Sequence, residues 1–180
     1  MSETQPGQPQ PAPQPGAPAM MVNVQYVKDL SFEVPGAPQI FAQLRAQPQV
    51  SINLDVQARR VQEGVPSFEV ALMIRAEANE APANGASGSA TAGNGQAGAP
   101  VFVAELTYAG VFTIQGVPDN QIDYVLLVEC ARLLFPFARN ILADATREGG
   151  FPPVLLQPID FMALYQARMA QAAGTPPVIA

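Results

Sequence analysis

Apolar and polar residues alternate along two stretches of the chain, VSINLDV (50–56) and SFEVALMIRAE (67–77). Every second residue is apolar, so an extended chain would carry its apolar side chains on one face. This pattern is typical of antiparallel strands with one buried face. The residues predicted to face inward are Val50, Ile52, Leu54, Val56, Phe68, Val70, Leu72 and Ile74, and those predicted to face outward include Glu69, Arg75 and Glu77.

Two further stretches, NVQYVKDLSFEV (23–34) and VFVAELTYAGVFTI (101–114), alternate in the same way. In the first, Gln25, Asp29, Ser31 and Glu33 alternate with Val24, Tyr26, Leu30, Phe32 and Val34. In the second, one face carries Phe102, Leu106 and Tyr108, and the other carries Val103, Glu105 and Thr107. We therefore expect antiparallel strands in all these stretches, with 67–77 and 101–114 forming a hairpin.

A long helix is predicted to begin at Pro118 and Asp119 and to end at Gly149. It would be about 30 residues long and roughly 45 Å at 1.5 Å per residue. Residues 122–128 are apolar almost all round, which indicates burial from several sides. Pro136 falls within a later stripe of polar residues, so we expect it to face solvent and to kink the helix there.

A shorter helix is predicted from Asp160 to Gly174. Its inner face is expected to carry Phe161, Leu164, Tyr165, Arg168 and Met169. Strands followed by helices predict an α+β fold: a four-stranded antiparallel sheet, packed with one long kinked helix and the shorter C-terminal helix.

The expected domain organisation is a single domain over residues 21–173. Residues 1–20 are rich in proline and glutamine and are expected to be disordered. Residues 79–100 form a flexible loop rich in glycine and alanine, and 174–180 form a short flexible tail.

The composition argues against catalysis, metal binding and nucleic-acid binding. The chain has no histidine and a single cysteine, Cys130, which is interpreted as a small core residue that fits a reducing compartment. Without a histidine there is no histidine base or histidine metal ligand, and Cys130 has no histidine to activate it. The sequence also offers no phosphate-binding loop, so we predict no catalytic residues, no metal and no cofactor. The net charge of −6 argues against nucleic acid. No uncharged apolar run approaches the roughly 20 residues that span a bilayer, so direct membrane insertion is not expected.

Four blocks carry a resemblance to a known family: YVKDLSFEVPGAPQIF, GVFTIQGV, LLFPFARN and GGFPPVLLQPIDFMALY. In this order they resemble the SecB protein-export chaperones over residues 26–165, apart from the 79–100 loop. The resemblance implies an ATP-independent cytoplasmic chaperone that assembles as a homotetramer, a dimer of dimers. Such a protein binds unfolded secretory precursors and delivers them to the SecA motor. The alternative left open is a SecB-like chaperone dedicated to one partner, such as an antitoxin.

The resemblance also implies site residues. The client-binding groove would comprise Phe41, Phe137, Phe151, Leu164 and Tyr165, although each aromatic could instead belong to the core. The SecA-binding surface would comprise Asp29, Glu33, Val103 and Glu105, whose carboxylates could instead be an ordinary solvated face. The oligomer interface would comprise Ala104, Leu106, Tyr108, Ile122, Val125 and Leu126. The chain departs from the family in lacking tryptophan, in its longer loop and in its short uncharged tail.

Overall fold

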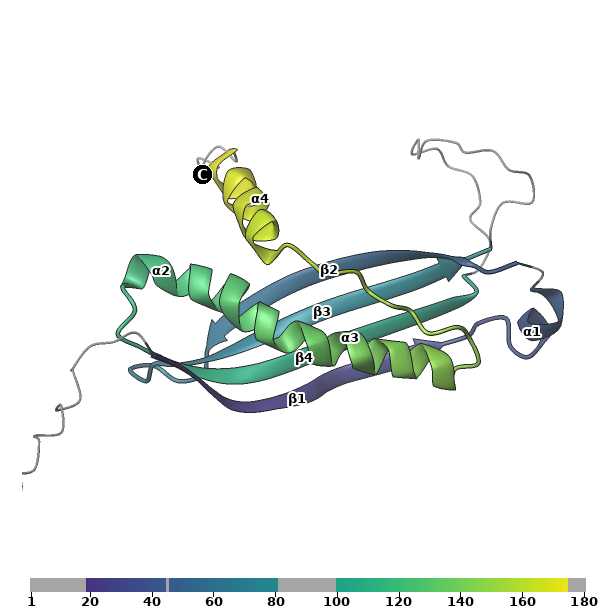
Figure 1. Ribbon diagram of the computed structural model, residues 1–180, viewed down its shortest axis with the longest axis horizontal. Coiled ribbons are helices and arrows are strands. Elements are labelled where there is room, and N and C mark those ends of the chain that lie inside the picture. Colours follow the sequence, from purple (N-terminus) through teal and green to yellow (C-terminus); the bar gives the residue numbers. More distant parts are fainter. Residues whose placement is uncertain (1–18, 45, 81–99, 175–180) are drawn as a thin grey trace, which may run out of the picture.

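The computed structural model describes residues 19–44, 46–80 and 100–174 (Figure 1). Four antiparallel strands form one sheet in the order β1-β4-β3-β2, so β1 and β2 are the edge strands. The strands are β1 (Ala19–Glu33), β2 (Gln49–Arg60), β3 (Ser67–Asn79) and β4 (Phe102–Gln115). The predicted four-stranded sheet and the β3–β4 hairpin are confirmed.

The helices are α1 (Gln39–Gln43), α2 (Asp119–Tyr124), the π-helical η1 (Val125–Cys130), α3 (Ala131–Glu148) and α4 (Phe161–Gly174). Figure 1 shows α2, η1 and α3 running on from one another as one long helical rod across one face of the sheet. We call this the covered face and its opposite the open face. The long helix therefore has the predicted ends, at Asp119 and Glu148.

The core lies between the covered face and α3. In β3 and β4, the even-numbered residues share this face because Leu72 pairs with Tyr108 and Ile74 with Leu106. All four of these side chains are buried, as the alternation predicts. The largest fully buried side chains of this core are Phe112, Phe161, Leu72, Leu106, Leu134 and Leu142.

β1 departs from the regular alternation that the sequence predicts. Two bulges, one on either side of residues 24–27, each leave one residue without a partner and exchange the faces of the residues that follow. Tyr26 pairs with Ala109 on the open face, whereas Phe32 pairs with Ala104 on the covered face. The prediction that these two rings share a face is therefore wrong.

The long helix departs from α-helical geometry before its proline, not at it. α3 continues through Pro136, which is exposed as predicted. The irregular part is η1, which overlaps the apolar stretch 122–128, and here Leu126 and Val128 are buried. π-helical segments of this length are local bulges within longer helices.

The chain after α3 is held by a short set of polar contacts. Gly150 has a φ of 88°, a conformation that favours glycine, and turns the chain out of the helix. The buried Thr146 hydroxyl donates to the carbonyl of Ala143 at 3.0 Å and accepts from the Val154 backbone N–H at 3.0 Å. These bonds fix the extended segment 151–160 against the end of α3.

α4 begins where the sequence predicts, since the Asp160 carboxylate accepts from the Ala163 N–H at 3.0 Å. Its predicted inner face is only partly correct. Phe161 is buried, but Leu164 and Met169 are 42% and 41% exposed. Figure 1 shows α4 beyond the β2 edge of the sheet and not over its face, and α4 packs mainly against η1.

The predicted segments 1–20, 79–100 and 174–180 lie mostly outside the described residues. Where they overlap the described part, Ala19 and Met20 belong to β1, Asn79 ends β3 and Gly174 ends α4.

Candidate binding surfaces

An apolar groove runs beside the edge strand β2, between it and the segment 151–160. It encloses about 400 Å³. Its apolar lining includes Val50, Ile52, Phe102, Val154, Leu155 and Leu156. We call it the β2 groove. Leu155 is the most exposed of these residues, at 61%.

The strand order explains why this groove is open. Val50 and Ile52 point to the covered face, because they pair with Ala78 and Ala76 of β3. Nevertheless they are 37% and 40% exposed. α3 packs against β4, β3 and β1, and it does not extend over the other edge strand, β2. The predicted inward row of β2 is therefore apolar but half uncovered.

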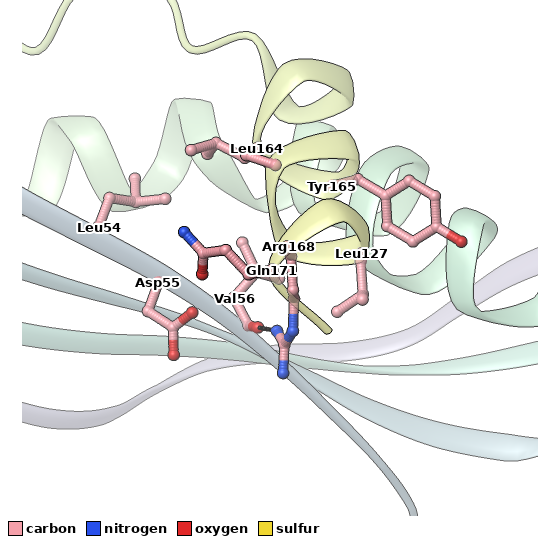
Figure 2. Close-up of a pocket in the computed structure, with 9 residues that line it drawn as sticks. Leu54, Asp55, Val56, Leu127, Leu164, Tyr165, Arg168 and Gln171 are labelled. Carbon is pink, nitrogen blue, oxygen red and sulfur yellow. Dashed lines mark hydrogen bonds between the residues drawn. The ribbon is translucent and has the colours of Figure 1, made fainter. Parts of the chain in front are cut away.

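A second hollow continues the same row toward α4 (Figure 2). It encloses about 320 Å³, and its lining includes Leu54, Val56, Leu127, Leu164, Tyr165 and Arg168. We call it the α4 hollow. One Arg168 guanidinium nitrogen donates to the backbone carbonyl of Val56 at 2.8 Å, which ties α4 to the edge of the sheet.

Aromatic rings gather where α1 meets the end of α3. Phe41 packs against Phe151 with ring centroids 5.3 Å apart, and Phe151 packs against Phe102 at 4.9 Å. Phe151 is buried, whereas Phe41 is 50% exposed. Phe102 also lines the β2 groove, so the rings form a continuous apolar wall beside it.

Phe137 lies elsewhere, on α3. It is 51% exposed and stacks beside Tyr108 at 6.3 Å. The five predicted groove residues therefore fall in three places: Phe41 with Phe151, Leu164 with Tyr165, and Phe137 beside Tyr108. Among the described residues, no ring contact joins Phe137 to the other two places.

The four residues predicted to meet SecA all lie on the open face. Glu33 pairs with Val103 and Asp29 with Thr107, and Glu105 lies between these positions on β4. Two of the four, Asp29 and Glu105, line a hollow of about 380 Å³ together with Asp55, Met73 and Arg75. We call the carboxylates of Asp29, Glu33, Asp55, Glu77 and Glu105 the acidic patch.

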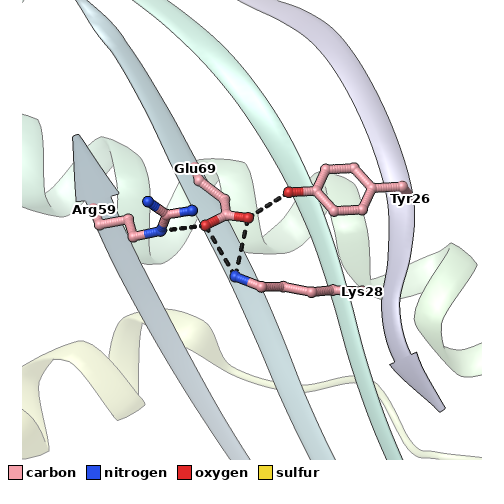
Figure 3. Close-up of polar contacts among 4 residues, drawn as sticks. All are labelled: Tyr26, Lys28, Arg59 and Glu69. Carbon is pink, nitrogen blue, oxygen red and sulfur yellow. Dashed lines mark hydrogen bonds and ion pairs between the residues drawn. The ribbon is translucent and has the colours of Figure 1, made fainter. Parts of the chain in front are cut away.

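A cluster of charged residues around the buried Glu69 occupies another part of the open face (Figure 3). Glu69 is only 3% exposed, although the alternation correctly directs it away from the core. Its carboxylate accepts from the Tyr26 hydroxyl and from Arg59, and from Lys28 at 3.1 Å. Burial alone would raise the pKa of Glu69, but the bonds from Tyr26, Arg59 and Lys28 outweigh it and lower the pKa to about 2.

This cluster links three strands across the sheet and was missed as a unit by sequence reasoning. The bulge in β1 brings Lys28 to the open face beside Tyr26, and no local pattern reveals that. The signal that could have found it is the Glu69–Arg59 pairing between adjacent strands, which places opposite charges face to face.

Some residues predicted at the oligomer interface are already covered within one chain. Ala104 and Leu106 are 0% and 1% exposed beneath the helical layer. Within one chain these two side chains pack into the core, and Tyr108 and Leu126 are also buried. The interface role of these four residues stays a prediction. Ile122 and Val125 are half-buried, and their interface role stays a prediction.

The described part of the chain offers no group of three or more acidic, cysteine or histidine residues that could hold a metal ion. Cys130 is buried, which together with nearby Glu129 raises the pKa of its thiol to about 12. A thiol held protonated in this way is a poor nucleophile. No helix among the described residues is long and apolar enough to cross a membrane.

The described residues thus place apolar hollows beside one sheet edge and charged side chains on the opposite face of the sheet. The family model "Preprotein translocase subunit SecB" matches residues 13–172. A "Protein-export protein SecB" of Granulibacter bethesdensis is 65% identical over 88% of this chain and 86% of that protein. That of Acidiphilium cryptum is 60% identical over 86% and 92%. The chain therefore belongs to the SecB family, and its role is that of a protein-export chaperone.

A solved structure supports the fold. It is the SecB-like chaperone Rv1957 of Mycobacterium tuberculosis, in complex with a ChAD peptide from the antitoxin HigA1. The TM-score is 0.57 at 13% identity, and the match covers 78% of this chain and 91% of the other.

Proposed function

We propose that the chain holds unfolded secretory precursors in the β2 groove and the α4 hollow, without ATP and without catalysing a reaction, and delivers them to SecA in the cytoplasm. The observation that carries this proposal is the half-uncovered apolar row of β2. Exposed apolar surface of this kind marks interaction sites on soluble proteins.

The spacing of that row suits an extended client. Val50, Ile52, Leu54 and Val56 follow one another at every second residue. In a strand this spacing is about 6.6 Å, the interval at which an extended client presents its own alternate side chains. Backbone groups at the edge of β2 would add hydrogen bonds that do not depend on the client's sequence. This combination supports binding of many different precursors.

SecA is proposed to bind the open face. The acidic patch suits a basic segment of SecA, because complementary charges steer association and fix register. In the described part of the chain, Asp29 and Glu33 make no ion pair or hydrogen bond, so both are available to a partner. Client and motor would then occupy opposite faces and could be bound together.

Assembly as a homotetramer, a dimer of dimers, is also part of the proposal. β1 is an edge strand, and Met21, Val24 and Val27 on it are between 45% and 59% exposed. A long apolar edge on an isolated monomer would promote uncontrolled pairing, which burial between copies removes. Ile122 and Val125 offer a second apolar surface on the long helix.

Two variants of the full-length chain test this two-surface proposal. Ile52→Asp places a charge in the β2 groove and should weaken holding of an unfolded precursor, measured as suppressed aggregation without ATP. Glu105→Lys reverses a charge of the acidic patch and should weaken SecA binding, more strongly at low salt than at high salt.

Each variant should leave the other activity and the mass by light scattering unchanged. A Glu105→Lys variant that bound SecA normally, or that lost both activities equally, would show the assignment of the two surfaces to be wrong. Proteins that co-purify with the chain in cells report the client range: many precursors are expected, and a single cognate protein would contradict general export.

A further inference from the structure

One cation already occupies part of the acidic patch. Arg75 of β3 pairs with Glu105 of β4 and, at 3.1 Å, with Glu77 of its own strand. Its register partner on β4 is Glu105 itself, so the arginine lies at the centre of the sheet, between β2 and β4. The patch therefore contains occupied carboxylates beside the unpaired Asp29 and Glu33.

The other cations of the open face are held differently. Lys28 and Arg59 both bind Glu69, whose side chain is 4% exposed, so their release would leave a buried carboxylate short of partners. The partners of Arg75 are far more exposed, at 46% for the Glu105 side chain and 35% for that of Glu77. Water can replace Arg75 at these carboxylates at small cost.

The surroundings of Arg75 suit a peptide that would replace it. The Arg75 side chain is 49% exposed at the hollow of the acidic patch, where Met73, which is 38% exposed, presents an apolar side chain. A basic extended segment with alternating apolar residues would match both features, because its lysines would meet carboxylates and an apolar side chain would meet Met73.

We propose that Arg75 is an internal competitor of the basic partner segment: it occupies Glu105 and Glu77 in the free chain and must leave them when the segment binds. The proposal rests on the proposed binding of SecA at the open face. Arg75 thereby weakens the complex and favours segments with enough positive charge to replace it at both carboxylates.

The test measures binding of SecA, and of a synthetic peptide of alternating lysine and leucine, to the full-length chain. Arg75→Gln should bind both more tightly than wild type by about two- to tenfold at low salt, because two exposed ion pairs no longer compete. The affinities of Arg75→Lys should lie between those of wild type and Arg75→Gln, since a lysine forms weaker, less directional ion pairs. The Arg75→Gln complex should also lose affinity more steeply as salt rises.

Arg132→Gln is the matched control. Arg132 is equally exposed, at 47%, and pairs with Glu129 on the long helix, so its loss changes the net charge by the same amount outside the open face. It should change affinity less than twofold. Equal tightening by both variants would attribute the effect to net charge and overturn the proposal, as would unchanged or weaker binding by Arg75→Gln.

The Glu105→Lys variant separates this inference from the proposed function. If Glu105→Lys weakens SecA binding and Arg75→Gln does not strengthen it, the surface is correct and only the role of Arg75 is wrong. If neither variant alters SecA binding, the surface itself is wrong.

Discussion

On the covered face of the sheet, the side chains of β3 and β4 are buried beneath the helices. On the open face of the same strands, the charged side chains of Arg75 and Glu105 are 49% and 46% exposed. The difference arises because successive side chains of β3 and β4 point alternately to the two faces of the sheet. At the edge strand β2 the helical cover stops, and the covered face continues as the β2 groove. One sheet thus carries an apolar surface and a charged surface on opposite faces, so the two surfaces stay separate.

Each side of the sheet also has a buried polar group that differs from its surroundings. A polar group beneath the helices, Thr146, satisfies its hydroxyl locally and uses it to position the segment that borders the groove. On the open face a buried carboxylate, Glu69, is surrounded by cations that would otherwise offset the acidic patch. Each exception therefore preserves the character of the neighbouring binding surface.

The largest expected effect distinguishes the two phenylalanines beside Pro136. Phe135 is 8% exposed and packs edge-on against Phe161, whereas Phe137 is 51% exposed. Phe135→Ala should lower the free energy of unfolding by about 3–5 kcal/mol. Phe137→Ala should cost about 1 kcal/mol, because roughly half of its ring is already in water. Urea denaturation of both variants measures this, and equal losses would place Phe137 in the core.

Next in size is the Glu69 cluster. Glu69→Gln keeps the shape of the side chain but replaces charged hydrogen bonds, which contribute about 1.5–3 kcal/mol each, with weaker neutral ones. We expect the variant to lose about 2–3 kcal/mol of unfolding free energy. Asp55→Gln, a change of the same charge at an exposed position of β2, should cost much less. Similar losses in both variants would refute a special role for the cluster.

The same cluster predicts a pH dependence. The pKa of Glu69 is lowered to about 2 in the folded chain, from an ordinary value of 4.5. Its stabilisation is therefore complete above about pH 5 and is lost as the pH falls from there toward 2. The difference in unfolding free energy between wild type and Glu69→Gln should stay constant from pH 8 to 5 and shrink below that. A difference that changed near neutral pH would contradict this assignment.

Much of the fold follows from local pattern, because alternation and helix-ending residues are local properties. The rows of β2, β3 and β4 and the helix ends at Asp119 and Glu148 are all readable in this way. The bulges of β1 are not, since an extra residue leaves composition and average alternation unchanged. η1 is not readable either, because its apolar residues would suit α-helical geometry equally well.

The binding surfaces were less accessible to sequence reasoning. The row of Val50 and Ile52 is plainly inward-facing in the sequence, but its exposure depends on β2 being an edge strand, and strand order is not a local property. Leu155 lies in an extended segment without periodicity, so nothing in the pattern indicates its face. The resemblance supplied the acidic residues of the open face, but not the pairing of Arg75 with Glu105.

A smaller effect is expected at Thr146, which connects the core to the groove. Thr146→Val retains the shape but leaves the Val154 N–H without its acceptor, at a cost of about 1–2 kcal/mol. Loosening of segment 151–160 should also raise the hydrogen-exchange rate of that amide and weaken client holding. Thr146→Ser preserves the hydroxyl and should retain both properties. If Thr146→Val protected the Val154 amide as well as wild type does, the anchoring role would be wrong.

The smallest effect sharpens the contrast between an apolar surface that binds and one that is merely exposed. Leu155 borders the β2 groove at 61% exposure, and Val61, at 47%, follows β2 at its far end outside the apolar hollows. Truncating either to alanine removes little buried surface, so unfolding free energies should change by less than about 0.5 kcal/mol. Leu155→Ala should nevertheless weaken binding of an unfolded precursor about three- to tenfold, because the methyl groups it loses are buried only in the complex. Val61→Ala should bind like wild type. Titration of a fluorescently labelled precursor measures both affinities, and equal affinities for the two variants would mean that clients do not use this groove.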